Sequence, residues 1–215
     1  MNEALITPIT LSASVRTRVK IPIHSRTSKQ RFEAEMVTFS GLSDIGEHLA
    51  IVFEPLNRSP YVRVHSECLT GDVFGSERCD CGEQLDEAIT MLGKLGGILL
   101  YLRQEGRGIG LYNKLDAYHL QISQGLDTFE ANQAINFPED MRDFRVAAEM
   151  LQALGIFEVS LVTNNPDKIA QLEKNGIRIG NVIPTGVFVN NTNHSYLRTK
   201  IDKHHHTINL GEEPQ

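Results

Sequence analysis

Three cysteines lie close together in the stretch from Arg63 to Cys81, which reads RVHSECLTGDVFGSERCDC. Cys68, Cys79 and Cys81 form a C-x10-C-x-C pattern, and the chain has no other cysteine. Thiolates are soft ligands, and three of them at this spacing suit zinc better than a hard cation. Because no fourth cysteine exists, we expect water in the fourth position, which is the arrangement of a catalytic zinc site.

Other interpretations of these cysteines remain open at this point. They could be small buried apolar residues, or a disulfide with one thiol left over. Their neighbours Glu67, Arg78 and Asp80 are charged, which argues against an apolar core, and nothing in the sequence indicates an oxidising compartment. His65 could also complete the tetrahedron in place of water, and the site would then be structural.

The composition is that of an ordinary globular protein, with 40% hydrophobic and 22% charged residues. The formal net charge of -6 argues against broad electrostatic contact with nucleic acid or an anionic membrane. An anionic ligand would therefore be held by local clusters of arginine, lysine and backbone N–H groups. The longest apolar run, around Ile98 to Leu102, is too short to cross a bilayer, and the N-terminus lacks a secretory signal pattern. We expect a cytoplasmic protein that keeps its thiols reduced.

The patterning of the whole chain predicts an α/β protein with a single domain over residues 1–215. Residues 1–60 alternate β-branched and apolar groups with turn formers, which indicates a β-rich N-terminal portion. Residues 61–203 would form the catalytic core. Residues 204–215 would be a tail, and its histidines, His204 to His206, are better explained by a mobile end than by a metal site.

Helices and strands in the core are indicated by their hydrophobic period. One helix is predicted from Gln84 to Leu95, ending at Gly96, and a second from Ile109 to Gln121. A third follows Asp143. The apolar run GILLYL predicts a short, fully buried strand, and FEVSLVT and IRIGNVIP predict two further strands.

A glycine-rich loop, RQEGRGIG, follows the strand GILLYL. Ligands of open α/β sheets gather at the carboxyl ends of strands, so this loop is a candidate for anion binding. Its glycines Gly106, Gly108 and Gly110 permit a backbone nest, and Arg103 and Arg107 could contact phosphate. The loop matches neither the dinucleotide nor the Walker pattern, so a plain turn remains the alternative.

The sequence TNNPDK follows the strand FEVSLVT in the same way. Asn165 is a predicted N-cap with Pro166 at the first helical position, which places Thr163 and Lys168 around a helix N-terminus suited to phosphate. Ordinary capping is the alternative there.

Three further segments carry polar groups beside predicted helices. Tyr118 lies on the stripe of the second helix and is by default a core or lining aromatic. Thr128 and Glu130 could cap a helix or touch a ligand, and capping is favoured. Asp140 and Arg142 precede the third helix, where aspartate can offset the helix dipole.

Together, the cysteine stretch, YLRQEGRGIGLYNKLDAY, DTFEAN, FPEDMRDF and LVTNNPDK resemble, in this order and spacing, the GTP cyclohydrolase II family, which starts riboflavin synthesis. The resemblance runs from about Arg63 to Lys203, whereas residues 1–60 match only in strand pattern and in HLAIVF. It implies a three-layer sandwich around a mixed β-sheet, a homodimer, GTP as the substrate, one zinc ion per chain and magnesium with the triphosphate. The segment Thr185 to Val187 departs from the larger apolar residues that the family more often has there.

The resemblance also assigns roles to residues of this sequence. It implies that zinc is bound by Cys68, Cys79 and Cys81. Catalysis would be served by Asp140, Arg142, Tyr118 and Glu67. Contacts with GTP would be made by Arg63, Val64, His65, Ser66, Glu67, Gln84, Glu105, Gly106, Arg107, Thr128, Thr163 and Lys168.

The expected chemistry fits these residue types. A zinc-activated water would add at carbon 8 of guanine, a second addition would release formate, and Glu67 or Tyr118 would move protons. Gln84 carries the donor and the acceptor that guanine demands. A guanidinium stays protonated and has essentially no free lone pair, so charge stabilisation beside Asp140 is an easier role for Arg142 than nucleophilic attack. The products would be 2,5-diamino-6-(5-phospho-D-ribosylamino)pyrimidin-4(3H)-one, formate and pyrophosphate.

Three rival functions remain from the sequence. A GTP-binding zinc regulator without turnover would keep the cysteines and the glycine loop, but it would not need Asp140, Arg142 and Tyr118 together. A paralogue that only opens the ring, or only releases pyrophosphate, would keep nearly all of these residues. The acidic charge argues against a nucleic-acid-binding zinc module.

Overall fold

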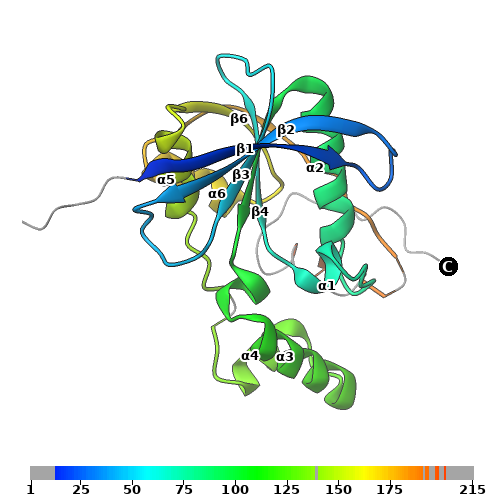
Figure 1. Ribbon diagram of the computed structural model, residues 1–215. Helices are drawn as coiled ribbons and strands as arrows, with labels where there is room; N and C mark the ends of the chain where they lie inside the picture. Colours follow the sequence, from blue (N-terminus) through cyan, green and yellow to red (C-terminus); the bar gives the residue numbers. More distant parts are fainter. Residues whose placement is uncertain (1–12, 139, 191, 194–196, 199–200, 202–215) are drawn as a thin grey trace, which may run out of the picture.

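The computed structural model describes residues 13–138, 140–190, 192–193, 197–198 and 201. The predicted histidine tail lies outside the described residues. A seven-stranded mixed sheet runs through the molecule in the order β1-β2-β3-β5-β4-β6-β7 (Figure 1). None of the helices within the described ranges is long and apolar enough to cross a membrane.

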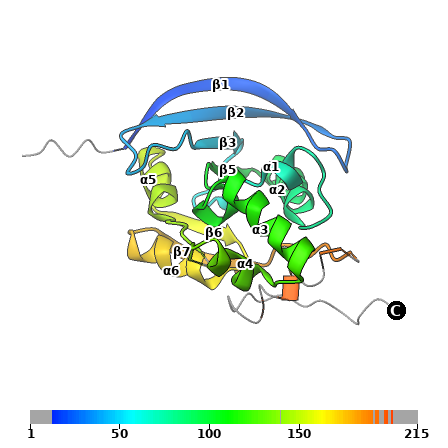
Figure 2. The ribbon, with the colours of Figure 1, turned by 90° about the horizontal axis from the view of Figure 1, so that it is seen from below.

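Half of the sheet is antiparallel and comes mainly from the N-terminal part of the chain. Its strands are β1 (Ser14–His24), β2 (Arg31–Ser40) and β3 (Leu49–Phe53), with β3 pairing antiparallel to β5 (Gly97–Leu102). Figure 2 shows β1 and β2 arching over one side of the molecule. The predicted β-rich N-terminal portion is confirmed within the described residues.

The other half of the sheet is parallel. It pairs β5 with β4 (Tyr61–Ser66), β4 with β6 (Glu158–Val162) and β6 with β7 (Arg178–Ile183). The strand that follows β4 in the chain, β5, lies on one side of it, and β6 lies on the other. In open α/β sheets, ligands bind outside the carboxyl ends of strands where the order reverses in this way. The segments after β4, β5 and β6 therefore meet at one edge.

Seven helical segments accompany the sheet in the described part of the chain. They are α1 (Leu69–Asp72), α2 (Cys81–Leu95), the 3-10 turn η1 (Glu105–Gly108), α3 (Leu111–Gln124), α4 (Thr128–Ala134), α5 (Arg145–Ala153) and α6 (Pro166–Lys174). The α3 and α4 pair stands away from the sheet, below the ends of its parallel strands (Figures 1 and 2).

The sheet has a hydrophobic core on each face. Along β5, Ile98 and Leu100 belong to the core shared with α5 and α6, whereas Leu99 belongs to the core shared with Ala88 and Leu92 of α2. This alternation follows from the period of two in a strand, and it explains why GILLYL is apolar throughout. Helix, sheet and helix thus form three layers, and the predicted α/β sandwich is confirmed.

Two predicted helices have different bounds in the structure. The helix expected from Gln84 begins earlier, at Cys81, with Asp80 as its N-cap. The helix expected from Ile109 begins at Leu111, because its N-cap Gly110 has a φ of 87° that only glycine adopts readily, and it continues to Gln124. The first of these shifts places a cysteine in the first turn of a helix.

Candidate active site

The three cysteines converge beside the carboxyl end of β4. Cys68 is the N-cap of α1, Cys81 is the first residue of α2, and Cys79 lies in the loop between these helices. Their sulfur atoms all lie within 4.8 Å of one another, and the Sγ atoms of Cys68 and Cys79 are 3.6 Å apart. Soft, close and largely buried thiols of this kind fit a zinc ion.

Two glycines let the cysteines approach one another. A Cβ atom on Gly71 would lie 2.9 Å from the Sγ of Cys79 and 3.4 Å from that of Cys68. A Cβ atom on Gly82 would lie 2.5 Å from the carbonyl oxygen of Gly71. Contacts under about 3 Å are not tolerated by real side chains, so α1 and α2 can approach this closely only with glycine at both positions.

The sulfurs share protons unequally. Hydrogen bonds from the thiols of Cys79 and Cys81 lower the pKa of Cys68 far below that of a free thiol. The same interaction with Cys68 raises the pKa of Cys79 to about 11, and it raises that of Cys81 as well. Because metals bind thiolates, a zinc ion would have to displace the protons of Cys79 and Cys81.

His65 is committed to a different partner. Its Nε2 lies 3.1 and 3.2 Å from the two carboxylate oxygens of Asp72, and burial lowers its pKa. Asp72 also accepts hydrogen bonds from the backbone N–H of Cys68 at 3.0 Å and the hydroxyl of Tyr101 at 2.8 Å. Among the described residues, the candidate metal ligands are the three cysteines alone. The alternative of His65 as a fourth ligand therefore gains no support.

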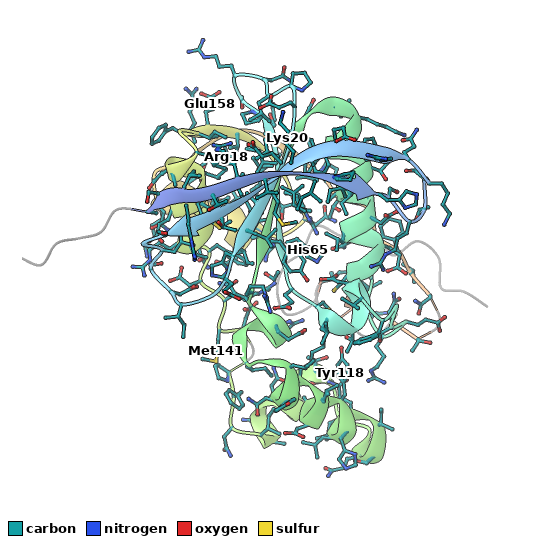
Figure 3. The ribbon with its side chains drawn as sticks, viewed as in Figure 1. Arg18, Lys20, His65, Tyr118, Met141 and Glu158 are labelled. Carbon is teal, nitrogen blue, oxygen red and sulfur yellow. The ribbon has the colours of Figure 1, made fainter. Side chains whose placement is uncertain are left out.

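A cavity next to the sulfurs gathers residues of the cysteine stretch and of the chain between residues 104 and 142. It is bounded by the cysteine stretch, the glycine-rich loop, α3 and α4, together with Arg142. Eleven of the predicted site residues line it: Ser66, Glu67, Cys68, Cys79, Cys81, Glu105, Gly106, Arg107, Tyr118, Thr128 and Arg142. Figure 3 shows Tyr118 on α3, below the sheet. His65 lies higher in the same view, on strand β4 of the sheet.

The glycine-rich loop has an unusual backbone. Gly106 and Arg107 have φ values of 61° and 60°, in the left-handed region that arginine rarely adopts. The carbonyl of Arg107 accepts a hydrogen bond of 2.9 Å from the backbone N–H of Met141, which ties the loop to the segment before α5. Strained backbone of this kind is found preferentially at functional sites.

Glu67 lines the cavity and is held by the partly exposed side chain of Arg103. Its Oε2 accepts a hydrogen bond of 2.8 Å from the Nε of Arg103, and this bond raises the pKa of Arg103. The backbone N–H of Arg103 donates to Nδ1 of His48, whose Nε2 lies 2.6 Å from Asp44. Since Nδ1 accepts a hydrogen bond, Nε2 carries the ring proton and donates a hydrogen bond to Asp44. This chain of contacts fixes Glu67 without occupying its second oxygen.

Asp140 and Arg142 form a two-pronged ion pair in the segment before α5. The Nε of Arg142 donates to both carboxylate oxygens, at 2.9 and 3.1 Å, and its Nη2 donates to Oδ2. Burial raises the pKa of Asp140, but the hydrogen bonds and charge of Arg142 outweigh burial and leave that pKa lowered. Asp140 is therefore a carboxylate, and it fixes the orientation of the guanidinium that lines the cavity.

Six predicted residues lie in a buried layer behind the cavity rather than on its wall: His65, described above, and two further groups. The first group is centred on Arg63, which is 5% exposed and donates to Gln84 Oε1 at 2.9 Å and to the carbonyl of Val162 at 3.1 Å. Gln84 in turn donates from Nε2 to Asp80 Oδ2 at 2.7 Å. Burial lowers the pKa of Arg63, which Glu87 and Asp80 partly offset.

The second buried group lies at the N-terminus of α6. The Nζ of Lys168 donates to the carbonyl of Val64 at 2.7 Å, and the Val64 side chain belongs to the hydrophobic core. Thr163 accepts from the backbone N–H of Asn165, which caps α6 with Pro166 in its first turn, as predicted. Thr163 and Lys168 therefore meet at a helix N-terminus, as the sequence indicated.

The departure at Thr185 has a structural reason. Glu87 of α2 accepts hydrogen bonds from the Thr185 hydroxyl at 2.6 Å and from the Gly186 backbone N–H at 2.9 and 3.0 Å. A Cβ atom on Gly186 would lie 2.7 Å from Glu87. A larger apolar residue in place of Thr185 would remove the hydroxyl donor of Glu87, and a side chain at position 186 would displace this half-buried carboxylate.

Helix capping explains the role of one of the two polar residues predicted beside α4. Asp127 and Glu130 form a reciprocal capping box at the start of α4, so the predicted capping role of Glu130 is confirmed. Thr128, the first residue of that helix, lines the cavity instead.

Sequence patterns missed two buried charged residues at the site, among others. Lys114 of α3 lines the cavity and is 7% exposed, and Asp72 is 3% exposed. A signal existed for Lys114, because it lies four residues before Tyr118 and so on the same helical face. Burial lowers the pKa of Lys114, but Tyr118, Cys68 and Glu105 outweigh burial and raise that pKa, so the side chain is an ammonium.

Known proteins are similar to this chain in sequence over most of its length. Residues 20–184 match the family described as GTP cyclohydrolase II. The chain is 52% identical over 201 residues to a GTP cyclohydrolase-2 of Vibrio cholerae, covering 92% of this chain and 100% of that protein. It is 52% identical over 197 residues to a GTP cyclohydrolase-2 of Psychromonas ingrahamii, covering 90% and 96%. A riboflavin biosynthesis protein RibBA of Bacillus cereus is 48% identical over 177 residues, which are 81% of this chain and 44% of that protein.

Proposed function

Because the chain belongs to the GTP cyclohydrolase II family, an enzyme family of riboflavin biosynthesis, we propose that it hydrolyses GTP in a zinc-dependent reaction. The products would be 2,5-diamino-6-(5-phospho-D-ribosylamino)pyrimidin-4(3H)-one, formate and pyrophosphate. The observation that carries the proposal is the convergence of three thiols on a cavity lined by Tyr118, Arg107 and Arg142. A ligand set of three sulfurs suits zinc and leaves one coordination position for the reaction.

The proposed zinc ion would be held by Cys68, Cys79 and Cys81. When bound, zinc supplies a Lewis acid that lowers the pKa of water into the neutral range. Glu67 would accept a proton at its second carboxylate oxygen, since Arg103 holds the first. Tyr118 would transfer protons to the ring nitrogens of guanine, because it lines the same cavity.

Guanine recognition would fall to Gln84 at the back of the site. Its amide oxygen accepts one hydrogen bond from Arg63, which leaves one lone pair. Its amide nitrogen donates strongly to Asp80 at 2.7 Å and only weakly to the carbonyl of Gly186 at 3.4 Å. One acceptor would thus be available to a base edge, and one donor would become available if the base replaced the Gly186 carbonyl as its partner. The backbone from Arg63 to Ser66 would complete this contact.

The triphosphate would be bound at the ends of β5 and β6. Gly106 and Arg107 offer backbone N–H groups and a guanidinium in the strained loop, and Thr163 and Lys168 lie at the N-terminus of α6. We propose that magnesium accompanies the triphosphate, as it does for most enzyme-bound nucleotides. Glu105 and Thr128 would contact the nucleotide from the cavity wall.

Arg142 would stabilise the negative charge that develops on the α-phosphate when pyrophosphate leaves. Its guanidinium is fixed by the two oxygens of Asp140 and lies 5.3 Å from the ring centroid of Phe144. A side chain held in this way acts as a preorganised cation, which is worth more in a partly dry cavity than in water. This role requires no deprotonation of arginine.

The test is the release of formate and pyrophosphate from GTP, each measured separately against GTP consumed. We expect one of each per GTP, loss of both on chelation, and loss of both in Cys79→Ser. The matched control is Glu77→Gln, an exposed residue of the same loop, which should keep full activity. Turnover that survives complete zinc removal would contradict the proposal, and release of only one product would indicate a paralogue with an incomplete reaction.

We also propose that the protein acts as a homodimer, as the family resemblance implied. Light scattering coupled to size-exclusion chromatography should give twice the chain mass of 24.0 kDa. A monomeric species with full turnover would contradict this part of the proposal.

A further inference from the structure

Lys114 is a buried cation placed between the candidate metal ligands and the rest of the cavity. It belongs to the first turn of α3 and is 7% exposed. A buried ammonium is costly unless each of its three protons has a partner, so the identity of those partners indicates its role.

The partners of Lys114 come from three different segments. Its Nζ donates to the Sγ of Cys68 at 3.2 Å, to the Oγ1 of Thr70 at 2.9 Å and to the Oε1 of Glu105 at 2.9 Å. The Nζ also lies 5.6 Å from the ring centroid of Tyr118, which is within cation–π range. Among the three cysteines of the candidate metal site, Lys114 contacts Cys68.

The contact with Cys68 has a clear electrostatic consequence. Three thiolates around one divalent cation carry a net charge of about -1. A negative cluster that is mostly removed from water needs a counter-charge, and a hydrogen bond from an ammonium to sulfur supplies it. Outer partners of this kind commonly change metal affinity by about 10- to 100-fold.

The contact with Glu105 extends this arrangement to the glycine-rich loop. Oε1 of Glu105 accepts from Lys114 and from the backbone N–H of Gly106 at 2.8 Å. Oε2 accepts from the backbone N–H of Leu69 at 2.7 Å. Leu69 directly follows Cys68, so one carboxylate joins the metal-binding turn to the loop that we assign to the triphosphate.

We propose that Lys114 is a positioning residue of the active site, which stabilises the Cys68 thiolate for metal binding and, through Glu105, aligns the metal-binding turn with the glycine-rich loop. This inference rests on the proposed zinc site. Two effects are distinguished. Lys114 alone compensates the charge at the Cys68 sulfur, whereas the Lys114–Glu105 pair aligns the glycine-rich loop.

The test measures zinc affinity by competition with a chromophoric chelator, without any assay of turnover. We expect Lys114→Met to bind zinc about 10- to 100-fold more weakly than the wild type. Lys114→Arg keeps the charge and should stay within about threefold of the wild type, since an arginine also donates to sulfur. Lys94→Met removes an exposed lysine of α2 and is the matched control, with no expected change.

A second readout distinguishes an electrostatic role from a structural one. In the cobalt(II)-substituted protein, loss of the hydrogen bond to sulfur makes the thiolate more electron-rich, so its charge-transfer absorption should move to lower energy in Lys114→Met. Lys114→Arg should keep the wild-type band. Glu105→Gln should also keep this band and the zinc affinity within about threefold, while it weakens binding of a non-hydrolysable GTP analogue.

The outcomes separate this inference from the proposed function. If the wild-type protein binds no zinc at the cysteines, the proposed function fails first. If it binds one zinc per chain and Lys114→Met binds it equally well with an unchanged cobalt band, the role of Lys114 is refuted. If Lys114→Met does not fold, Lys114→Gln replaces it, because an uncharged donor should give an intermediate affinity and band position. Equal zinc loss in Glu105→Gln would also overturn the proposal.

Discussion

The predicted site residues fall into two regions that differ in how their polar groups are satisfied. The cavity region presents sulfurs, Glu67, Tyr118 and Arg142 to a space bounded by α3 and α4. The buried region behind it, around Arg63 and Lys168, consists of side chains bonded to the sheet and to one another. Both regions lie at the same edge of the parallel strands.

This difference separates two ways in which a residue can serve one reaction. A cavity residue can lose its function while the fold keeps its free energy of unfolding. A residue of the buried region supports both the activity and the stability of the fold, because its removal leaves desolvated partners without hydrogen bonds. The following substitutions test this separation.

The largest expected effect is on catalysis in the cavity region. Asp140→Asn removes the charge that orients Arg142, and we expect kcat to fall by about 10²- to 10⁴-fold. The free energy of unfolding should change by only about 1 kcal/mol, because the amide still accepts a hydrogen bond. The control is Asp143→Asn, whose exposed carboxylate accepts a hydrogen bond from the backbone N–H of Arg145. Full activity of Asp140→Asn would show that the Asp140 carboxylate is not needed for catalysis.

The next effect is on stability in the buried region. Arg63→Met leaves the Gln84 oxygen and the Val162 carbonyl without their donor, and it removes the cation near Asp80 and Glu87. We expect a loss of about 3 kcal/mol in the free energy of unfolding, measured by urea denaturation. Arg178→Met, at an exposed position, should change it by less than about 0.5 kcal/mol. If the free energy of unfolding of Arg63→Met falls by less than about 1 kcal/mol, the two regions do not differ in their contribution to stability.

A smaller effect tests the boundary of the buried region. Gly186→Ala places a methyl group 2.7 Å from Glu87 Oε1, which must then move away from Thr185. We expect a loss of about 1 to 3 kcal/mol, as in other overpacked sites. In Gly180→Ala the new methyl has ordinary contacts at 3.4 Å and should cost less than about 1 kcal/mol. Equal unfolding midpoints of the two variants would refute this reason for the glycine.

The smallest effect concerns pH and the Asp140–Arg142 pair. The folded-state pKa of Asp140 is lowered below its usual value near 3.8, so the pair contributes stability above the unfolded pKa. That contribution is lost as the pH falls through the folded value. Urea denaturation between pH 3 and pH 7 should therefore show a difference between wild type and Asp140→Asn that narrows below about pH 4. A difference that stays constant over this range would contradict the assignment.

Local patterns predicted those parts of the molecule that local physics determines. The apolar run GILLYL indicated a buried strand, and the Asn165-Pro166 pair indicated the start of α6, because hydrophobic period and capping act within one element. The cysteine spacing indicated a metal site for the same reason. Lys114 was missed because its partners, Cys68 and Glu105, come from other segments. Whether Gln84 and Lys168 face a cavity or a buried layer likewise depends on packing between elements, which period and capping do not encode.

The close contact between Gly71 and Gly82 has a consequence for the proposed zinc site. The spacing of the sulfurs is set by two backbones in contact, within a layer stabilised by the sheet and α2. Small zinc domains unfold when their ion is removed, since the ion supplies most of their folding energy. Here the ligands are preorganised by the polypeptide itself. Chelation should yield an inactive but fully folded chain, and simple addition of zinc should restore turnover without refolding.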